Sequence, residues 1–222
     1  VDVVAELLDA RIPMSSANPM VEELVQGKPR IVILNKADLA DPKATDRWIS
    51  YYQKKNIPVV PMSVGNSKNK KKLLSLIRET AEPMLAKWRK RGIKSRSVRL
   101  MILGIPNVGK STLINFLAGT AATRTANTPG HTRGKQWVRL SEGLDLLDTP
   151  GVLWPKFDDQ VAALRLAATG AIAGDVFNAD EVVPELLASL AETAPWVLQE
   201  KYDIEDVHQD PQLLLEAAGR RR

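Results

Sequence analysis

Hydrophobic and polar positions form two alternating patterns over the first 154 residues of the chain. Short apolar runs at 1–8, 31–34, 59–60 and 98–103 are typical of buried strands. Between them lie amphipathic stretches in which apolar residues return every three or four positions, as they do on one face of a helix. This alternation predicts βα units built around a mostly parallel sheet.

Local signals place the intervening helices. Asn18-Pro19 and Asp41-Pro42 each combine a capping side chain with proline at the first helical position. A long helix carrying apolar residues over 73–88 is predicted after the third strand, and a basic linker over 87–96 is expected to follow it. A further helix is predicted over 111–117, directly after the fourth strand.

The remaining pattern predicts one hairpin and then helices alone. Two apolar runs, 136–140 and 144–147, flank Glu142-Gly143, which is typical of an antiparallel hairpin turn. Beyond residue 155 only helical patterns occur: 161–168, 181–190, 196–202 and 211–217. The sequence therefore predicts an α/β domain over 1–154, with a mostly parallel sheet and one antiparallel hairpin strand, and a small all-helical domain over 155–222.

The amino-acid composition excludes several kinds of functional site. The 222 residues contain no cysteine, which excludes disulfides, thiolate metal sites and cysteine nucleophiles. The two histidines, His131 and His208, are far apart in sequence, so a histidine-rich metal site is not expected. No apolar run is long enough to span a bilayer. The chain starts without Met inside an apolar stretch, which favours a longer natural protein.

A phosphate-binding loop is the strongest chemical signal. Gly104-Ile-Pro-Asn-Val-Gly-Lys-Ser111 matches GxxxxGK[ST] and lies between a predicted strand and a predicted helix, as that motif requires. Glycines allow backbone N–H groups from Asn107 to Thr112, including that of Val108, to surround phosphates at the positive end of a helix. Lys110 would reach the β- and γ-phosphates, and the Ser111 hydroxyl would bind Mg²⁺.

A second motif predicts which base is read. Asn35-Lys36-Ala37-Asp38 follows a predicted strand and matches NKxD, which reads guanine in P-loop GTPases. The Asp38 carboxylate can accept hydrogen bonds from the guanine N1–H and exocyclic amine, which adenine does not offer. Ser63 and Val64 follow the next strand and would present backbone N–H groups to the guanine O6.

The third motif is a common pattern, and it indicates a nucleotide site only because it follows a predicted strand. Asp148-Thr-Pro-Gly151 matches DxxG after an apolar strand, which would place Asp148 near Mg²⁺ through water and the Gly151 N–H near the γ-phosphate. Thr132 lies between the phosphate loop and Asp148, where its hydroxyl would be a second protein ligand of Mg²⁺. The alternative for Thr132 is a polar turn around Pro129-Gly130.

The order of these motifs along the chain differs from the usual one. In ordinary GTPases the phosphate loop comes first and the base-reading loop comes near the end, whereas here the residues from Asn35 to Ser63 precede the phosphate loop. The segments can occupy the same positions in space if the usual termini are joined and the chain is opened elsewhere. We therefore predict a P-loop GTPase fold in circularly permuted order, with 87–96 as the joining segment.

Taken together, the motifs resemble those of the YlqF/RbgA family. The match rests on Asp9-Ala-Arg-Ile-Pro13, Asn35 to Asp38, Gly104 to Thr112, Pro129-Gly-His-Thr132 and Asp148 to Pro155. The resemblance implies a circularly permuted GTPase that assists late assembly of the large (50S) ribosomal subunit, with GTP or GDP and Mg²⁺ as ligands. It also implies contacts with rRNA and ribosomal proteins, in the cytoplasm or an organelle matrix.

The source of the group that orients the attacking water is left open. Val152 occupies the position where Ras-like enzymes carry glutamine, and its side chain cannot polarise water. The resemblance implies a histidine from a segment that precedes this chain, so slow hydrolysis is expected without that segment or the ribosome. His131 and Gly151 are candidates for catalytic roles. Asn107 is a candidate ligand for K⁺ beside the phosphates, the alternative being a loop-shaping asparagine.

Charged residues are distributed unevenly along the chain, and their distribution indicates what kind of partner the protein binds. Residues 1–154 contain 25 Lys and Arg against 13 Asp and Glu, whereas residues 155–222 contain 6 against 13. Basic residues concentrate in 87–99 and 68–72, which suits RNA, although such runs are often only a solvated face. We expect a monomer that binds neither membrane nor DNA. Two other functions stay open: a nucleotide-gated rRNA-binding scaffold with incidental hydrolysis, or a GTPase of the small subunit.

Overall fold

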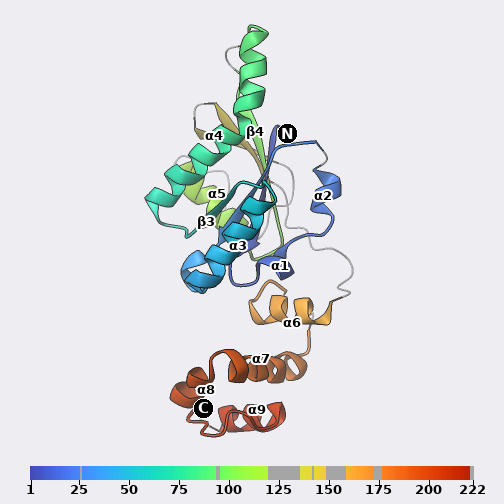
Figure 1. Ribbon diagram of the computed structural model, residues 1–222, viewed down its shortest axis with the longest axis vertical. Coiled ribbons are helices and arrows are strands. Elements are labelled where there is room, and N and C mark those ends of the chain that lie inside the picture. The colour runs from blue at the N-terminus through green and yellow to red at the C-terminus, as the bar shows by residue number, and fades with distance from the viewer. Residues whose placement is uncertain are drawn as a thin grey trace. The chain divides into compact units, whose positions relative to one another are not determined.

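In the computed structural model the chain divides into two compact units, Val1–Lys156 and Phe157–Arg222 (Figure 1). The structure describes residues 1–25, 27–93, 96–119, 136–141, 143–148, 159–172 and 177–220. In this described part, no helix has the length and apolar character needed to cross a membrane.

The first unit is built on a six-stranded sheet in the order β3-β2-β1-β4-β6-β5. All neighbouring strands are parallel except β5 and β6. The strands are β1 (Val3–Asp9), β2 (Arg30–Asn35), β3 (Val59–Met62), β4 (Val98–Gly104), β5 (Gln136–Ser141) and β6 (Leu144–Asp148). The predicted mostly parallel sheet with one antiparallel hairpin strand is confirmed.

Helices connect the parallel strands and flank the sheet (Figure 1). They are α1 (Pro13–Ser16), α2 (Val21–Leu24), the 3₁₀ helix η1 (Ala37–Leu39), α3 (Pro42–Lys54), α4 (Ser67–Lys90) and α5 (Lys110–Ala118). The central strands β1 and β2 are almost entirely buried, which explains why they read as continuous apolar runs.

Two helix boundaries differ from the prediction. The helix expected to start at Pro19 begins at Val21, after a turn in which the Asn18 side chain accepts a hydrogen bond from the Met20 N–H (2.9 Å) and the Asn18 carbonyl accepts one from the Val21 N–H (3.0 Å). The basic linker expected over 87–96 is helical through Lys90. Lysine and arginine favour helices and are stabilised at a helix C-terminus by the helix dipole, so a basic run there extends α4.

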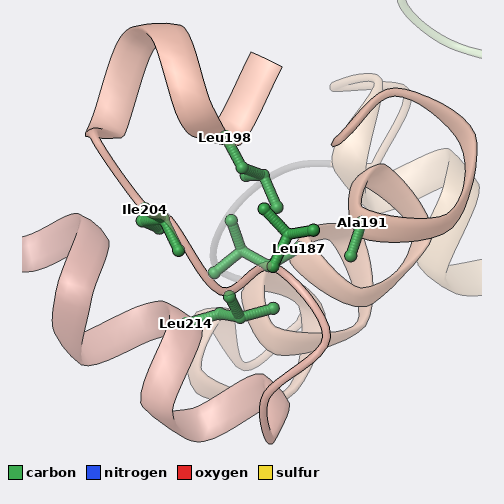
Figure 2. Close-up of a cluster of buried hydrophobic side chains, with 6 residues drawn as sticks. Leu187, Ala191, Leu198, Ile204 and Leu214 are labelled. Atoms are coloured by element: carbon green, nitrogen blue, oxygen red, sulfur yellow. The ribbon is translucent and has the colours of Figure 1, made fainter. Parts of the chain in front are cut away.

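The second unit contains α6 (Gln160–Ala168), α7 (Ala179–Thr193), α8 (Pro195–Tyr202) and α9 (Pro211–Gly219). Figure 2 shows how side chains from α7, α8, α9 and the segment before α9 converge on one apolar core. Its buried members are Leu187, Ala191, Leu198, Ile204, Val207 and Leu214. Leu186 of α7 and Leu213 of α9 are exposed.

Candidate functional site

Parallel strands bring several polar loops to one edge of the sheet. Asp9 ends β1 and lies in register with Asn35, which ends β2. Leu7 of β1 is paired with Gly104, which ends β4 and begins the phosphate loop. Because the carboxyl ends of parallel strands meet at a common edge, a ligand site is expected there.

Asn35 joins the base-reading loop directly to the phosphate loop. The residue is only 2% exposed, and its side-chain Nδ2 donates a hydrogen bond to the Val108 carbonyl at 2.8 Å. Among the described residues, Asn35 Oδ1 has no hydrogen-bond partner, which is uncommon for a buried polar atom. The two motifs, 73 positions apart in sequence, are therefore adjacent in space.

Lys36 makes the second link between these loops. Its backbone is left-handed (φ 58°), an unusual conformation for a residue with a side chain. The ammonium group donates to the Asn107 carbonyl at 3.1 Å and to Asp9 Oδ2 at 3.0 Å. The lysine thus contacts both the phosphate loop and the end of β1.

The phosphate loop depends on two glycines where there is no room for a side chain. Gly109 has φ +97°, and a Cβ there would lie 2.5 Å from Asn35 Nδ2. A Cβ on Gly104 would lie 3.0 Å from the Leu7 carbonyl oxygen. Glycine at these positions allows the backbone to approach Asn35 of the base-reading loop and strand β1.

The phosphate loop leads into α5 at its N-terminal end. Gly109 is the N-cap residue and Lys110 the first residue of this nine-residue helix. The Lys110 side chain is buried, with 7% of the residue exposed, whereas Ser111 is half-buried and Thr112 is exposed. A buried lysine beside a glycine-rich helix N-terminus creates a site of positive potential that suits phosphate.

The other base-reading residues lie at the same sheet edge. Ala37 and Asp38 begin η1, and Asp38 is exposed. Ser63 and Val64 directly follow β3, which lies against η1. Their order along the edge agrees with one continuous site running from the base-reading loop to the phosphate loop.

Three predicted site residues lie outside the described residues: His131, Thr132 and Gly151. Asp148 is described through its backbone only. It ends β6, which runs parallel to β4, so its backbone lies at the same sheet edge as the phosphate loop. The donor set of Ser111, Thr132 and Asp148 consists of hydroxyl and carboxylate oxygens, the ligands that Mg²⁺ prefers.

The Asp9 carboxylate is a feature of the site whose role the motif analysis did not assign. It is 2% exposed and lies between Arg11 and Lys36. Burial, the largest single influence, raises its pKa, but hydrogen bonds from Arg11 and Lys36 outweigh burial and hold the pKa below 3.8. The signal in the sequence was the acid at the end of a buried strand, one strand away from the base-reading motif.

The sheet order and the joined loops define a P-loop GTPase whose segments follow one another in circularly permuted order. A family model described as 50S ribosome-binding GTPase matches residues 99–208. The chain is 44% identical to the ribosome biogenesis GTPase A of Bacillus licheniformis, and the match covers all of this chain and 78% of that protein. The chain belongs to the ribosome biogenesis GTPase A (YlqF/RbgA) family, which confirms the predicted resemblance, and it is a GTPase.

Two other similarities extend the comparison. A mitochondrial ribosome-associated GTPase 1 of Ictalurus punctatus is 34% identical, over 97% of this chain and 70% of that protein. A GDP-bound YlqF structure superposes with a TM-score of 0.65 at 25% identity, covering 99% of this chain and 90% of that one. The fold is therefore that of a known guanine nucleotide-binding protein.

Proposed function

We propose that the site binds GTP and GDP across the edge formed by β3, β2, β1 and β4, as part of a cycle of ribosome assembly. The observation that carries this proposal is the pair of bonds from Asn35 to Val108 and from Lys36 to Asn107. They hold the base-reading and phosphate loops next to each other, as binding of a single nucleotide requires.

Each end of the nucleotide has its own set of residues in this proposal. Asp38 accepts hydrogen bonds from the guanine N1–H and amine, and the backbone at Ala37, Ser63 and Val64 surrounds the base. The Lys36 stem covers one face of the ring. The orphaned buried oxygen of Asn35 supports a site that receives a further donor on ligand binding.

Phosphate binding rests on the loop and the first turn of α5. Backbone N–H groups from Asn107 to Thr112 surround the β-phosphate, and Lys110 contacts the β- and γ-phosphates. Ser111 and Thr132 would hold Mg²⁺ directly, and Asp148 would do so through water. The ion, when bound, neutralises charge on the phosphates.

Two further roles concern the hydrolysis step. We propose that Asn107 helps to hold K⁺ beside the phosphates, where a cation would stabilise charge that develops in the transition state. Asn107 lies within the phosphate loop and has a left-handed backbone (φ 57°), which supports a role beside the phosphates. The Gly151 N–H would contact the γ-phosphate, and His131 is a candidate for a catalytic role.

The partner that we propose is rRNA of the large ribosomal subunit, bound by a monomer. The C-terminal end of α4 projects beyond the sheet (Figure 1) and carries exposed Lys87, Arg89, Lys90 and Arg91 in its last turn and cap. Such a concentration of cations suits a phosphate backbone. Since bacterial and mitochondrial relatives share the family, the compartment would be the cytoplasm or an organelle matrix, wherever the ribosome is assembled.

Two arginine–tryptophan pairs in the first unit suit unpaired bases. The Arg96 guanidinium lies 4.2 Å from the Trp88 ring centre, and Arg99 lies 5.3 Å from the Trp137 ring centre. Trp137 on β5 is 52% exposed. Arginine stacked on an accessible tryptophan is a common platform for bases of single-stranded RNA.

The base-reading proposal is tested by Asp38→Asn. Replacing the carboxylate removes two charge-assisted hydrogen bonds, so the affinity for GDP should fall about a hundredfold while affinity for xanthosine diphosphate rises. Titration of each nucleotide, monitored by fluorescence, measures both changes. Asp46→Asn, an exposed acid on α3, is the matched control. Equal binding of GDP by wild type and Asp38→Asn would remove this residue from the base site.

The ribosomal proposal is tested by co-sedimentation with separated subunits in GTP and in GDP. We expect nucleotide-dependent association with the large subunit and weaker association as salt increases. Replacing the four basic residues at the end of α4 by Gln should reduce both the affinity and the salt dependence. Gln at Lys43, Arg47 and Lys54 on α3 is the control. Preference for the small subunit would instead favour the alternative GTPase function.

A further inference from the structure

The buried Asp9 carboxylate has all of its acceptor positions occupied. Its Oδ1 accepts from the Arg11 backbone N–H (3.0 Å) and from Arg11 Nε (2.9 Å). Its Oδ2 accepts from Arg11 Nη2 (2.7 Å) and Lys36 Nζ (3.0 Å). One buried anion is thus surrounded by two cations, an arrangement that fixes both cationic side chains in direction.

The backbone around Asp9 is equally well fixed. The Asp9 N–H donates to Ser16 Oγ (3.0 Å), and this hydroxyl donates to the Pro13 carbonyl (3.2 Å). The next N–H, that of Ala10, donates to the Asn35 carbonyl at 2.8 Å. The carboxylate therefore extends from a rigid position between β1 and β2.

Lys36 is the only described residue of the base-reading motif whose charge Asp9 contacts directly. Its ammonium is shared between Asp9 and the Asn107 carbonyl of the phosphate loop. Without the carboxylate, the ammonium would keep a single neutral acceptor and would face the Arg11 guanidinium with no anion between them. A long lysine side chain has many rotamers, so the loss of this partner would release it.

We propose that Asp9 is a positioning residue for guanine nucleotide binding, which acts by holding the Lys36 ammonium against the phosphate loop. Asp9 lies outside the base-reading and phosphate-loop motifs, and its effect is exerted through Lys36. This inference rests on the proposed guanine nucleotide site. It predicts a role in affinity and none in the chemical step, because Asp9 contacts the base-reading side of the site.

A second buried acid of β1, Glu6, is a control for the possibility that Asp9 only stabilises the fold. Glu6 is also a buried acid of β1 (1% exposed), and it forms an ion pair with Arg30. Glu6 additionally accepts a hydrogen bond from the Asn18 N–H at 3.3 Å, so it is held by a backbone donor as Asp9 is. These two partners, Arg30 and Asn18, belong neither to the base-reading loop nor to the phosphate loop.

The test compares Asp9→Asn with Glu6→Gln, using wild-type chain as reference. Asp9→Asn should weaken binding of fluorescently labelled GDP about tenfold and raise the KM for GTP by a similar factor, with kcat unchanged. Glu6→Gln should lower the unfolding temperature while leaving both values within twofold of wild type. If Asp9→Asn does not fold, Asp9→Ser retains acceptor lone pairs in a smaller side chain and repeats the measurement.

A double-mutant cycle with Lys36→Met identifies the route of the effect. Methionine retains an aliphatic stem and lacks the ammonium, so adding Asp9→Asn should then cause no further loss of affinity. Additive losses, an equal loss in Glu6→Gln, or normal GDP binding by Asp9→Asn would each overturn the inference. If the wild-type chain itself bound no GDP, the proposed nucleotide site would fail and this inference with it.

Discussion

At the scale of single residues, the phosphate loop depends on a glycine at a position where a larger side chain would collide with a neighbouring residue. Gly109→Ala would combine an unfavourable positive φ with a Cβ that displaces the Asn35 amide. Gly92 also has positive φ (+78°), but a Cβ there meets nothing within 4 Å, so Gly92→Ala isolates the backbone cost. We expect about 1 kcal/mol for Gly92→Ala and about 3 kcal/mol for Gly109→Ala. Denaturant unfolding measures both.

The Asp9 carboxylate makes a second prediction at this scale. Since its folded pKa lies below 3.8, ionised Asp9 stabilises the folded state fully above that pH, and its contribution is lost as the pH falls through the folded pKa. The difference in unfolding free energy between wild type and Asp9→Asn should therefore shrink from about pH 5 downward. A difference that stays constant to about pH 2 would contradict this linkage.

Sequence patterns specified the glycine and lysine positions of the site but gave no role to Asp9. Asn35, Lys36 and Gly109 belong to motifs whose chemistry is local, so spacing along the chain reveals them. The contacts of Asp9 depend on the register of β1 against β2, which places it beside Asn35. Such a contact follows from strand pairing and becomes visible only in three dimensions.

At the scale of elements, capping residues set the helix boundaries most reliably. Asp41 begins α3 as predicted, with its side chain accepting from the Ala44 N–H at 2.6 Å. Asp41→Ala should lower the unfolding free energy by about 1 kcal/mol, because one backbone donor loses its partner. Asp46→Ala, within the same helix and exposed, should have almost no effect in the same unfolding measurement.

Elements with weaker signals were harder to predict. The four-residue helix α1 has no capping side-chain hydrogen bond and was not expected from the sequence. The boundary of α4 was placed too early because a run of basic residues was interpreted as a linker, whereas it continues the helix to Lys90. Short helices and charged helix ends carry little periodic hydrophobic signal, so tertiary packing and helix electrostatics decide them.

At the scale of the whole molecule, each of the two units buries apolar side chains of its own. Leu198 is fully buried in the core of the second unit (Figure 2). Leu198→Ala should destabilise that unit by about 3 kcal/mol without changing the affinity for GDP. Ile33→Ala, in β2 beside the base-reading loop, should lower both stability and affinity. Calorimetry and nucleotide titration of the two variants distinguish these outcomes.

The bond from Asn35 to Val108 has a consequence for how the protein is made. During synthesis the base-reading segment leaves the ribosomal exit tunnel first, and its acceptor on the phosphate loop follows 73 positions later. A nascent chain that ends before Val108 has β1 and β2 but nothing to receive phosphates. Guanine nucleotide can therefore stabilise the growing polypeptide only after β4 has joined the sheet, which makes ligand capture a late event in its biogenesis.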